Sequence, residues 1–318
     1  MTKSRSRVML VAVAMALLTA RTAGAQEVTL ITSFNTGVIL GGAKEFVYNS
    51  GLVLSELDWP LLPAITVGAA VSLTTRVGFL ASLEVQTAIP MKTGTMTDTD
   101  FLNLDGVPCL FSASDGVLRG AFLLTAQAGW SLPLPPDQPV TLVAPFLQFE
   151  YLYLQWDAEN GYTQYPPQPP LTSPPGSFNP VLPSTPKVPI TGTGIIYTQN
   201  YFIPSFGLKV VYRPLDSLTV DISVAFSPYV WCNDTDQHLF RSDVFYDNPR
   251  GGIMIEPRLS AALKISTHVS LAFDALYRHI GGLVGDTLVT GPDAGYYSNT
   301  SGVSLDEVSL SLVLAYHF

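Results

Sequence analysis

Strict alternation of apolar and polar residues limits the fold of this chain more than any other feature of its sequence. It is clearest over residues 308–318, where every second side chain is large and apolar and most of the others are small or polar. The apolar positions are Val308, Leu310, Leu312, Leu314, Tyr316 and Phe318. A period of two is typical of a β-strand, whose successive side chains point to opposite faces. An apolar face opposite a small, polar face predicts a strand of a barrel that stands in lipid.

The same alternation recurs upstream, and it decides which class of membrane protein is possible. It is present in 202–213, 218–226, 253–264 and 269–278. After the first 25 residues, no stretch reaches the roughly 18 consecutive apolar residues that a membrane helix needs, so a helical bundle is excluded. A soluble sandwich would also alternate, but strands longer than the usual length and the terminal Phe318 favour lipid outside. In lipid the sheet has to close, because every backbone group must be bonded.

The N-terminal segment has the three parts of a secretory signal peptide. A basic start precedes an apolar run at 8–18, and Ala23-Gly24-Ala25 supplies the small residues of a cleavage site. We therefore expect a signal peptide at 1–25 and one outer-membrane barrel domain at 26–318. Cleavage would change the net charge from −9 to −13, because the segment holds four basic residues and no acidic one. So acidic a chain argues against nucleic acid as a partner, since phosphate contacts need clustered Lys and Arg.

The connections between alternating segments fall into short turns and longer, more polar stretches. Short turns suit the periplasmic side of a barrel and long ones the extracellular side. Long connections are expected at 46–52, 91–115, 158–192, 233–250 and 281–302. Five of them predict an all-β fold: a ten-stranded antiparallel transmembrane β-barrel with long extracellular loops. Residues 166–189 hold ten of the 25 prolines, which predicts semi-rigid polyproline or disordered chain without a packed core, either a plain surface loop or a proline-rich recognition ligand.

One of the four histidines lies in a long connection beside acidic residues. In Asp234-Thr235-Asp236-Gln237-His238 the acids and the histidine are two residues apart, and such residues share a face of an extended chain. Asp236 would then hold the His238 ring in one tautomer, as a general base requires. Asp98 and Asp100 repeat the spacing, although such a pair alone is more often a solvated loop or an adventitious calcium ligand. Of the other histidines, His268 and His317 are expected to be structural, and His279 ends a strand.

Four segments together resemble the omptins, a family of outer-membrane proteases with a ten-stranded barrel. They are residues 44–48, 54–59, 95–101 and 234–238, which occur in the family's order over essentially the whole mature chain. The resemblance implies a surface endopeptidase that uses no cofactor and no metal. It places the protein in the outer membrane, with its active site facing the extracellular side.

The resemblance also implies a catalytic role for four residues. Asp98 and His238 would activate the water that attacks the peptide bond, and Asp236 would orient His238. Asp100 would complete the acidic pair and, while protonated, help to stabilise the oxyanion. A shared proton is physically reasonable, because two carboxyl groups this close do not both ionise easily.

Glu45 and Asp234 match the acids that the family uses to bind Arg or Lys before the cut. Two carboxylates in a partly dehydrated pocket favour a cation, and the forked guanidinium of Arg satisfies both better than Lys does. The implied partners are therefore cationic peptide or protein substrates and outer-membrane lipid, with no nucleic acid. A catalytically inactive barrel that acts as an adhesin or structural protein is the main alternative. A solute pore is less favoured, because side chains fill most of so narrow a barrel.

Some positions depart from the family pattern. Strict alternation counted from Phe226 places Asp234, Asp236 and His238 on the outer face, so a bulge or strong twist near Pro228 is needed. Asp105 and Asp115 are weak candidates for the acid that binds substrate beyond the cut.

Two further expectations concern lipid and cysteine. No Lys or Arg occurs near Leu152, Tyr153 or Asn200, where the family's arginines for lipopolysaccharide would align. We therefore expect activity that does not depend on this lipid. Cys109 and Cys232 are the only cysteines, and the sequence leaves open whether they form a disulfide or remain free thiols.

Overall fold

The computed structural model describes residues 28–132, 134 and 138–318, so the predicted signal peptide lies outside the described residues. Within this part the chain forms thirteen antiparallel strands in one sheet. No helix among these residues is long and apolar enough to span a membrane. The all-β class is thereby confirmed. The strands are β1 (Val28–Asn49), β2 (Leu52–Thr75), β3 (Phe79–Ala88), β4 (Met91–Asp100), β5 (Leu110–Trp130), β6 (Val140–Gln164), β7 (Val188–Leu215), β8 (Leu218–Ser227), β9 (Val230–His238), β10 (Asp243–Asp247), β11 (Arg250–Lys264), β12 (Val269–Thr290) and β13 (Gly295–His317).

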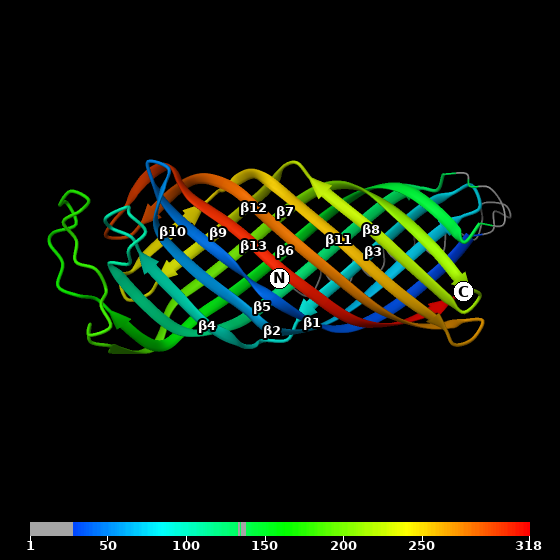
Figure 1. Ribbon diagram of the computed structural model, residues 1–318, viewed down its shortest axis with the longest axis horizontal. Coiled ribbons are helices and arrows are strands. Elements are labelled where there is room, and N and C mark those ends of the chain that lie inside the picture. The colour runs from blue at the N-terminus through cyan, green and yellow to red at the C-terminus, as the bar shows by residue number, and fades with distance from the viewer. Residues whose placement is uncertain (1–27, 133, 135–137) are drawn as a thin grey trace, which may run out of the picture.

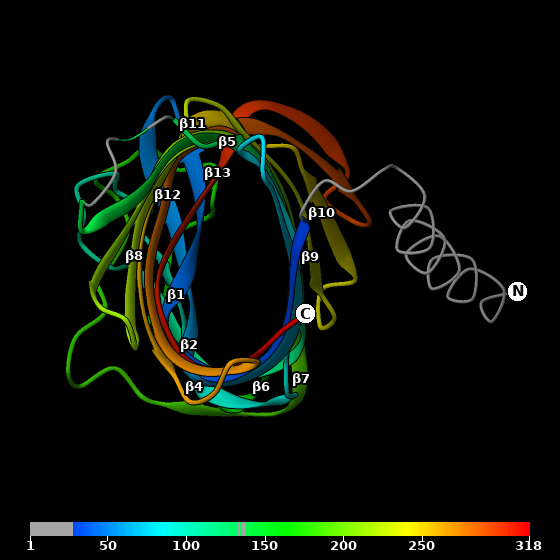
Figure 2. The same ribbon diagram turned by 90° about the vertical axis from the view of Figure 1, so that its right-hand side faces the viewer.

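The sheet closes on itself because its first strand pairs on both sides. β1 is hydrogen-bonded to β13 and to β2, each in antiparallel register. Figure 2 shows the resulting ring end-on, and Figure 1 shows the long tilted strands from the side. A closed sheet leaves no unpaired edge, which is what a lipid environment demands of a β-structure.

The predicted number of ten strands is not confirmed, because three of the thirteen strands are separated from their predecessors by short breaks. Pro90, Pro228 and Pro249 lie in the gaps between β3 and β4, β8 and β9, and β10 and β11. Proline has no N–H for the ladder, so a strand is interrupted there. The strands on the two sides of each gap share their neighbours; β3 and β4, for example, both pair with β2 and β5.

Four of the expected long outer loops were wrong as loops. Most of 46–52, 91–115, 233–250 and 281–302 forms strands that pair as hairpins. These hairpins stand where both faces meet polar surroundings, so their sequences lack the apolar stripe that identifies a strand in lipid.

The outer wall changes character along the barrel. Leu312, Leu314 and Phe318, near the C-terminus, are 56%, 54% and 68% exposed, as the alternation predicted. Nearer the hairpin tips the same wall carries ion pairs, such as Lys44–Glu56 at 2.5 Å. An apolar band followed by charged residues is the outer surface expected of a barrel that leaves the bilayer. The residue after Lys44 already belongs to the site described below, which therefore lies outside the membrane-spanning segments.

A buried ionic cluster occupies the barrel interior. The Arg278 guanidinium donates to Glu256 at 2.8 Å, to Glu307 at 2.6 Å and to Glu150 at 2.9 Å. None of these four side chains is more than 5% exposed. Burial of three carboxylates around one guanidinium makes this cluster the main polar cross-link between β6, β11, β12 and β13.

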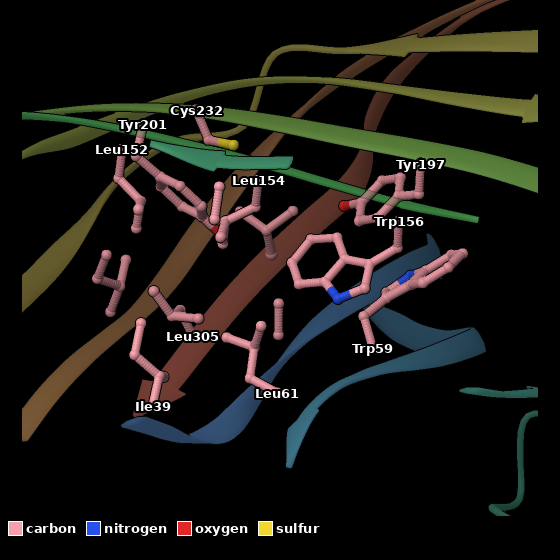
Figure 3. Close-up of a cluster of buried hydrophobic side chains, with 14 of the residues drawn as sticks. Ile39, Trp59, Leu61, Leu152, Leu154, Trp156, Tyr197, Tyr201, Cys232 and Leu305 are labelled. Atoms are coloured by element: carbon pink, nitrogen blue, oxygen red, sulfur yellow. The ribbon is translucent and has the colours of Figure 1, made fainter. Parts of the chain in front are cut away.

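A layer of aromatic rings separates this cluster from the mouth of the barrel. The ring centroid of Trp59 lies 4.9 Å from that of Tyr197 and 6.0 Å from that of Trp156, and Figure 3 shows the three side chains together. The Trp156 indole N–H donates to the Pro60 carbonyl at 3.1 Å. Tyr197 pairs in register with Asp236, so the layer forms the floor of the site.

Candidate functional site

One wall of the site comes from β1, β2 and β4. Glu45 pairs with Leu57, and Leu57 pairs with Asp98, so the three lie side by side across neighbouring strands. Met96 is 1% exposed in the core, and the period of two turns Asp98 and Asp100 to the same inner face. The structure thus brings the predicted residues Glu45, Asp98 and Asp100 together on one wall.

The opposite wall comes from β7, β9 and β10. Asp236 pairs with Tyr197 on one side and with Phe245 on the other. Asp234 and Asp236 are only 3% and 2% exposed, and His238 is partly buried. These side chains face inward, although strict alternation from β8 would turn them outward.

A change of phase at the break after β8 explains this orientation. Ala225 and Ser227 are buried at the end of β8, and Val230 and Cys232 are buried at the start of β9. Two intervening residues shift the inward set from odd to even positions, and the Ser227 hydroxyl closes the break by donating to the Tyr229 carbonyl at 2.8 Å. The irregularity expected near Pro228 is therefore present, and it aims the acidic residues of β9 into the barrel.

His238 is held from three sides. Its Nε2 lies 2.5 Å from Asp236 Oδ2, and its Nδ1 lies 2.9 Å from Arg241 Nη2. The Phe245 ring packs edge-on at a centroid distance of 5.3 Å. Because an arginine can only donate, Nδ1 accepts and Nε2 carries the proton that Asp236 receives. Arg241 was not identified from the sequence, because it lies in the turn between β9 and β10, within a segment expected to be loop.

The two walls influence each other's protonation. Burial, and then the charge of Asp100, raises the pKa of Asp98 to about 7, while His238 acts to lower it. Burial also raises the pKa of Asp100, against a hydrogen bond from Ser55. Burial lowers the pKa of His238, but the charge and hydrogen bond of Asp236 outweigh it, so that the net shift is upward. A carboxyl group and an imidazole whose pKa values are both raised in their buried surroundings are suited to proton transfer.

A second group of acidic side chains lies in the barrel beside Asp98 and His238. Glu45, Asp234 and Asp247 are all buried, and one carboxylate oxygen of each lies within 4.8 Å of the other two. Asp247 was missed because 233–250 was interpreted as a loop. Recognition of the β9–β10 hairpin would have found it, since Asp247 is the register partner of Asp234.

The remaining sequence candidates lie away from the site. Asp115 is on the outer wall, where its carboxylate pairs with Lys92 at 2.6 Å. Asp105 is exposed and accepts a hydrogen bond from the Val107 amide at 2.9 Å. Neither lines the barrel mouth, so neither supports the assignment to substrate beyond the cut. Cys109 and Cys232 are buried free thiols, and the disulfide is not formed.

The proline-rich segment is more ordered than expected. It is the green loop beyond the end of the barrel in Figure 1. The Asn103 carboxamide, from the neighbouring β4–β5 connection, accepts from the Gly176 and Phe178 amides at 2.8 and 3.0 Å and donates to the Phe178 carbonyl at 3.0 Å. Gln168 donates to the Cys109 carbonyl at 2.9 Å. Side-chain amides, rather than an apolar core, hold this loop to the connection that follows Asp100.

Comparisons with known proteins agree with this architecture. The family model described as the omptin family matches residues 25–318. The solved structure of the outer membrane protease OmpT from Escherichia coli superposes with a TM-score of 0.80 at 16% identity, over 91% of this chain and 97% of that one. The translocator domain of the autotransporter NalP from Neisseria meningitidis gives a TM-score of 0.37 at 9% identity, over 98% and 96%. No curated protein sequence matches. The OmpT likeness shows that the two chains share a fold.

Proposed function

Because this chain belongs to the omptin family, we propose that it is an outer-membrane endopeptidase that cleaves after basic residues with a water activated by Asp98 and His238. Family membership and the OmpT-like fold support an outer-membrane protease. The observation that carries the finer proposal is the meeting of Asp98 and Asp100 with Asp236 and His238 at one barrel mouth. These pairs are far apart in sequence, and burial raises the pKa of Asp98 into the range where a carboxyl group exchanges protons near neutral pH.

The reaction begins with a water between Asp98 and His238. Asp236 fixes the imidazole with Nε2 protonated, so Nδ1 is the basic nitrogen. Arg241 donates to Nδ1 and must turn away before Nδ1 can accept a proton. Water attacks the peptide carbonyl as it loses a proton to this pair, and Asp100 donates a hydrogen bond to the developing oxyanion. His238 then returns the proton to the leaving amine, as in other acid–base mechanisms.

The side chain before the cut enters the pocket of Glu45 and Asp234. Both carboxylates are buried, and burial raises the pKa of Glu45 well above its usual value. A substrate cation restores the ionised form, because opposite charges in a dehydrated pocket attract strongly. Arg is preferred to Lys, since its planar fork of donors reaches two carboxylates at once.

Peptide hydrolysis by the purified, refolded chain tests the activity. We expect the wild type to cleave an Arg-containing peptide and His238→Ala to lose at least about two orders of magnitude in kcat, the usual contribution of a general base. His279→Ala is the matched control, because His279 bonds to Asp306 on the outer wall at 2.8 Å. A wild-type protein without peptidase activity would instead support the inactive-barrel alternative.

Matched peptides with Arg, Lys or Gln before the cut test the specificity. We expect the order Arg, then Lys, with Gln lower by at least about a hundredfold in kcat/KM, because Gln leaves the buried acids unpaired. The Glu45→Gln/Asp234→Asn double variant should lose this preference. Equal rates on Arg and Gln peptides would disprove the pocket assignment and leave the catalytic one standing.

A further inference from the structure

Three carboxyl groups converge inside the barrel, and none of them forms an ion pair with a described residue. Glu45, Asp234 and Asp247 are 4%, 3% and 5% exposed. Their nearest carboxylate oxygens all lie within 4.8 Å of one another. They come from β1, β9 and β10, so the closed barrel, rather than local sequence, assembles them.

Most carboxylate oxygens of these three residues have no hydrogen-bond partner among the described residues. Glu45 Oε2, both carboxylate oxygens of Asp234 and Asp247 Oδ1 are buried without a hydrogen bond from any described residue. A fourth side chain, outside the acidic group, also has an unpaired acceptor oxygen. Gln199 is the register partner of Asp234, and its amide Oε1 has no donor in the described part of the chain, while its Nε2 donates to the Tyr197 hydroxyl at 2.9 Å. The four side chains therefore present several unpaired acceptors on neighbouring strands.

Such a set of atoms requires a positive charge from outside. Ionised carboxylates buried this close to one another repel, and each buried acceptor without a hydrogen bond destabilises the fold. Protonation satisfies these oxygens only in part, because a protonated carboxyl group has one O–H to donate. A substrate guanidinium or a metal ion satisfies them more fully.

The donor set selects the class of metal. Carboxylate and amide oxygens are the ligands of hard cations, and Ca²⁺ binds six to eight oxygens at about 2.3–2.6 Å, which allows two of them to lie up to about 5 Å apart. The oxygen separations here fit that limit. The imidazole nitrogens nearby are not free for a softer metal, because His238 is bonded through both of them.

The geometry points to a Ca²⁺ site formed by Glu45, Asp234, Asp247 and the Gln199 amide oxygen. Because Glu45 and Asp234 also form the pocket of the proposed function, on which this part of the inference rests, Ca²⁺ competes there with the basic side chain of the substrate. The protease is then inhibited by a divalent cation that occupies the pocket before the substrate does.

Direct binding is measured without reference to activity. The refolded chain is treated with a chelator, in detergent free of lipopolysaccharide, and titrated with Ca²⁺ by calorimetry. We expect one Ca²⁺ per chain for the wild type and for Asp115→Asn, a carboxylate control on the outer wall. Asp247→Asn should weaken binding at least tenfold. Absence of Ca²⁺ binding, or equal binding by Asp247→Asn, overturns the site.

A second variant guards against a folding defect. Gln199→Ala removes only the amide oxygen and should also weaken Ca²⁺ binding, and both variants are checked for the compact band that a folded barrel shows on unheated gels. If Asp247→Asn does not fold, Gln199→Ala decides: unchanged affinity in that variant overturns the site.

Kinetics then separate this inference from the proposed function. With an Arg peptide, Ca²⁺ should raise KM at least tenfold and leave kcat unchanged, and the effect should shrink in Asp247→Asn. A fall in kcat at constant KM overturns the competition. A protein that binds one Ca²⁺ but cleaves nothing refutes the peptidase proposal and supports the metal site, whereas an active protease that binds none refutes the site alone.

Discussion

Asp98 is the residue whose charge limits the proposed reaction most directly. Burial and Asp100 raise its pKa to about 7, whereas His238 and a hydrogen bond from Ser55 lower it. The Ser55 hydroxyl donates to Asp98 Oδ1 at 3.3 Å. Asp98 has to be ionised to accept a proton, and His238 has to be neutral. Both conditions are met as the pH rises, so activity is lost on the acidic side.

The pH dependence of kcat/KM checks this assignment. We expect activity to rise from about pH 5, with an apparent midpoint near the Asp98 pKa of about 7, and to fall at higher pH where Asp100 loses the proton it donates to the oxyanion. Ser55→Ala removes a donor that stabilises the ionised form, so its midpoint should move to higher pH. Thr97→Ala, on the outer face of the same strand, is the control. A midpoint that Ser55→Ala leaves in place would contradict the role of Asp98.

At the scale of single elements, the link between the β4–β5 connection and the proline-rich loop is open to test. Asn103 makes three hydrogen bonds to the backbone of that loop. We expect Asn103→Ala to release the loop, at a cost of about 0.5–1.5 kcal/mol for each partly exposed hydrogen bond that is lost. Limited digestion by an added protease measures it, in a His238→Ala background that excludes self-cleavage. Ser173→Ala, in the same loop, serves as the control, and equal digestion rates would refute the clamp.

The outer face of the paired strands β6 and β7 bears on the expectation that activity does not depend on lipopolysaccharide. This face holds Tyr151, Tyr153 and Asn200, and the Tyr151 hydroxyl donates to the Asn200 carboxamide at 2.8 Å. These neutral groups offer a lipid phosphate no charge-assisted partner. We therefore expect peptide cleavage in detergent at the same rate with and without added lipopolysaccharide. Strict dependence on the lipid would show that cations elsewhere on the wall bind it.

The sequence predicts the elements that face lipid much better than those above it. The alternation of 308–318 corresponds to β13, because lipid outside and a polar interior impose opposite chemistry on alternate residues. β10 has no such contrast, since both of its faces meet polar groups, so its residues were interpreted as loop. The spacing of Asp234, Asp236 and His238 was readable as a motif. The contacts of Asp247 and Arg241 were not, because they depend on hairpin register.

For the whole molecule, the Arg278 cluster joins β12 to β6, β11 and β13 through buried ion pairs. Arg278→Met leaves Glu150, Glu256 and Glu307 buried without their cation, and we expect a loss of about 3–5 kcal/mol in the free energy of unfolding. Arg119→Ala is the control, because Arg119 pairs with Asp157 on the exposed outer wall and should cost about 1 kcal/mol or less. Urea titration of the refolded proteins compares them, and equal midpoints would disprove the role of the cluster.

The break at Pro228 and Tyr229 has a consequence for how such a protein can diversify. In β8, before the break, contact with the bilayer limits which substitutions are tolerated. In β9, after the break, the inward positions have changed from odd to even, and contact with the substrate limits the substitutions. Substitutions in β8 and substitutions in β9 can thus accumulate independently of each other. Deleting both Pro228 and Tyr229 would restore strict alternation across the break, and a barrel that still inserts would then carry Asp234 and Asp236 on its outer face, where they meet no peptide.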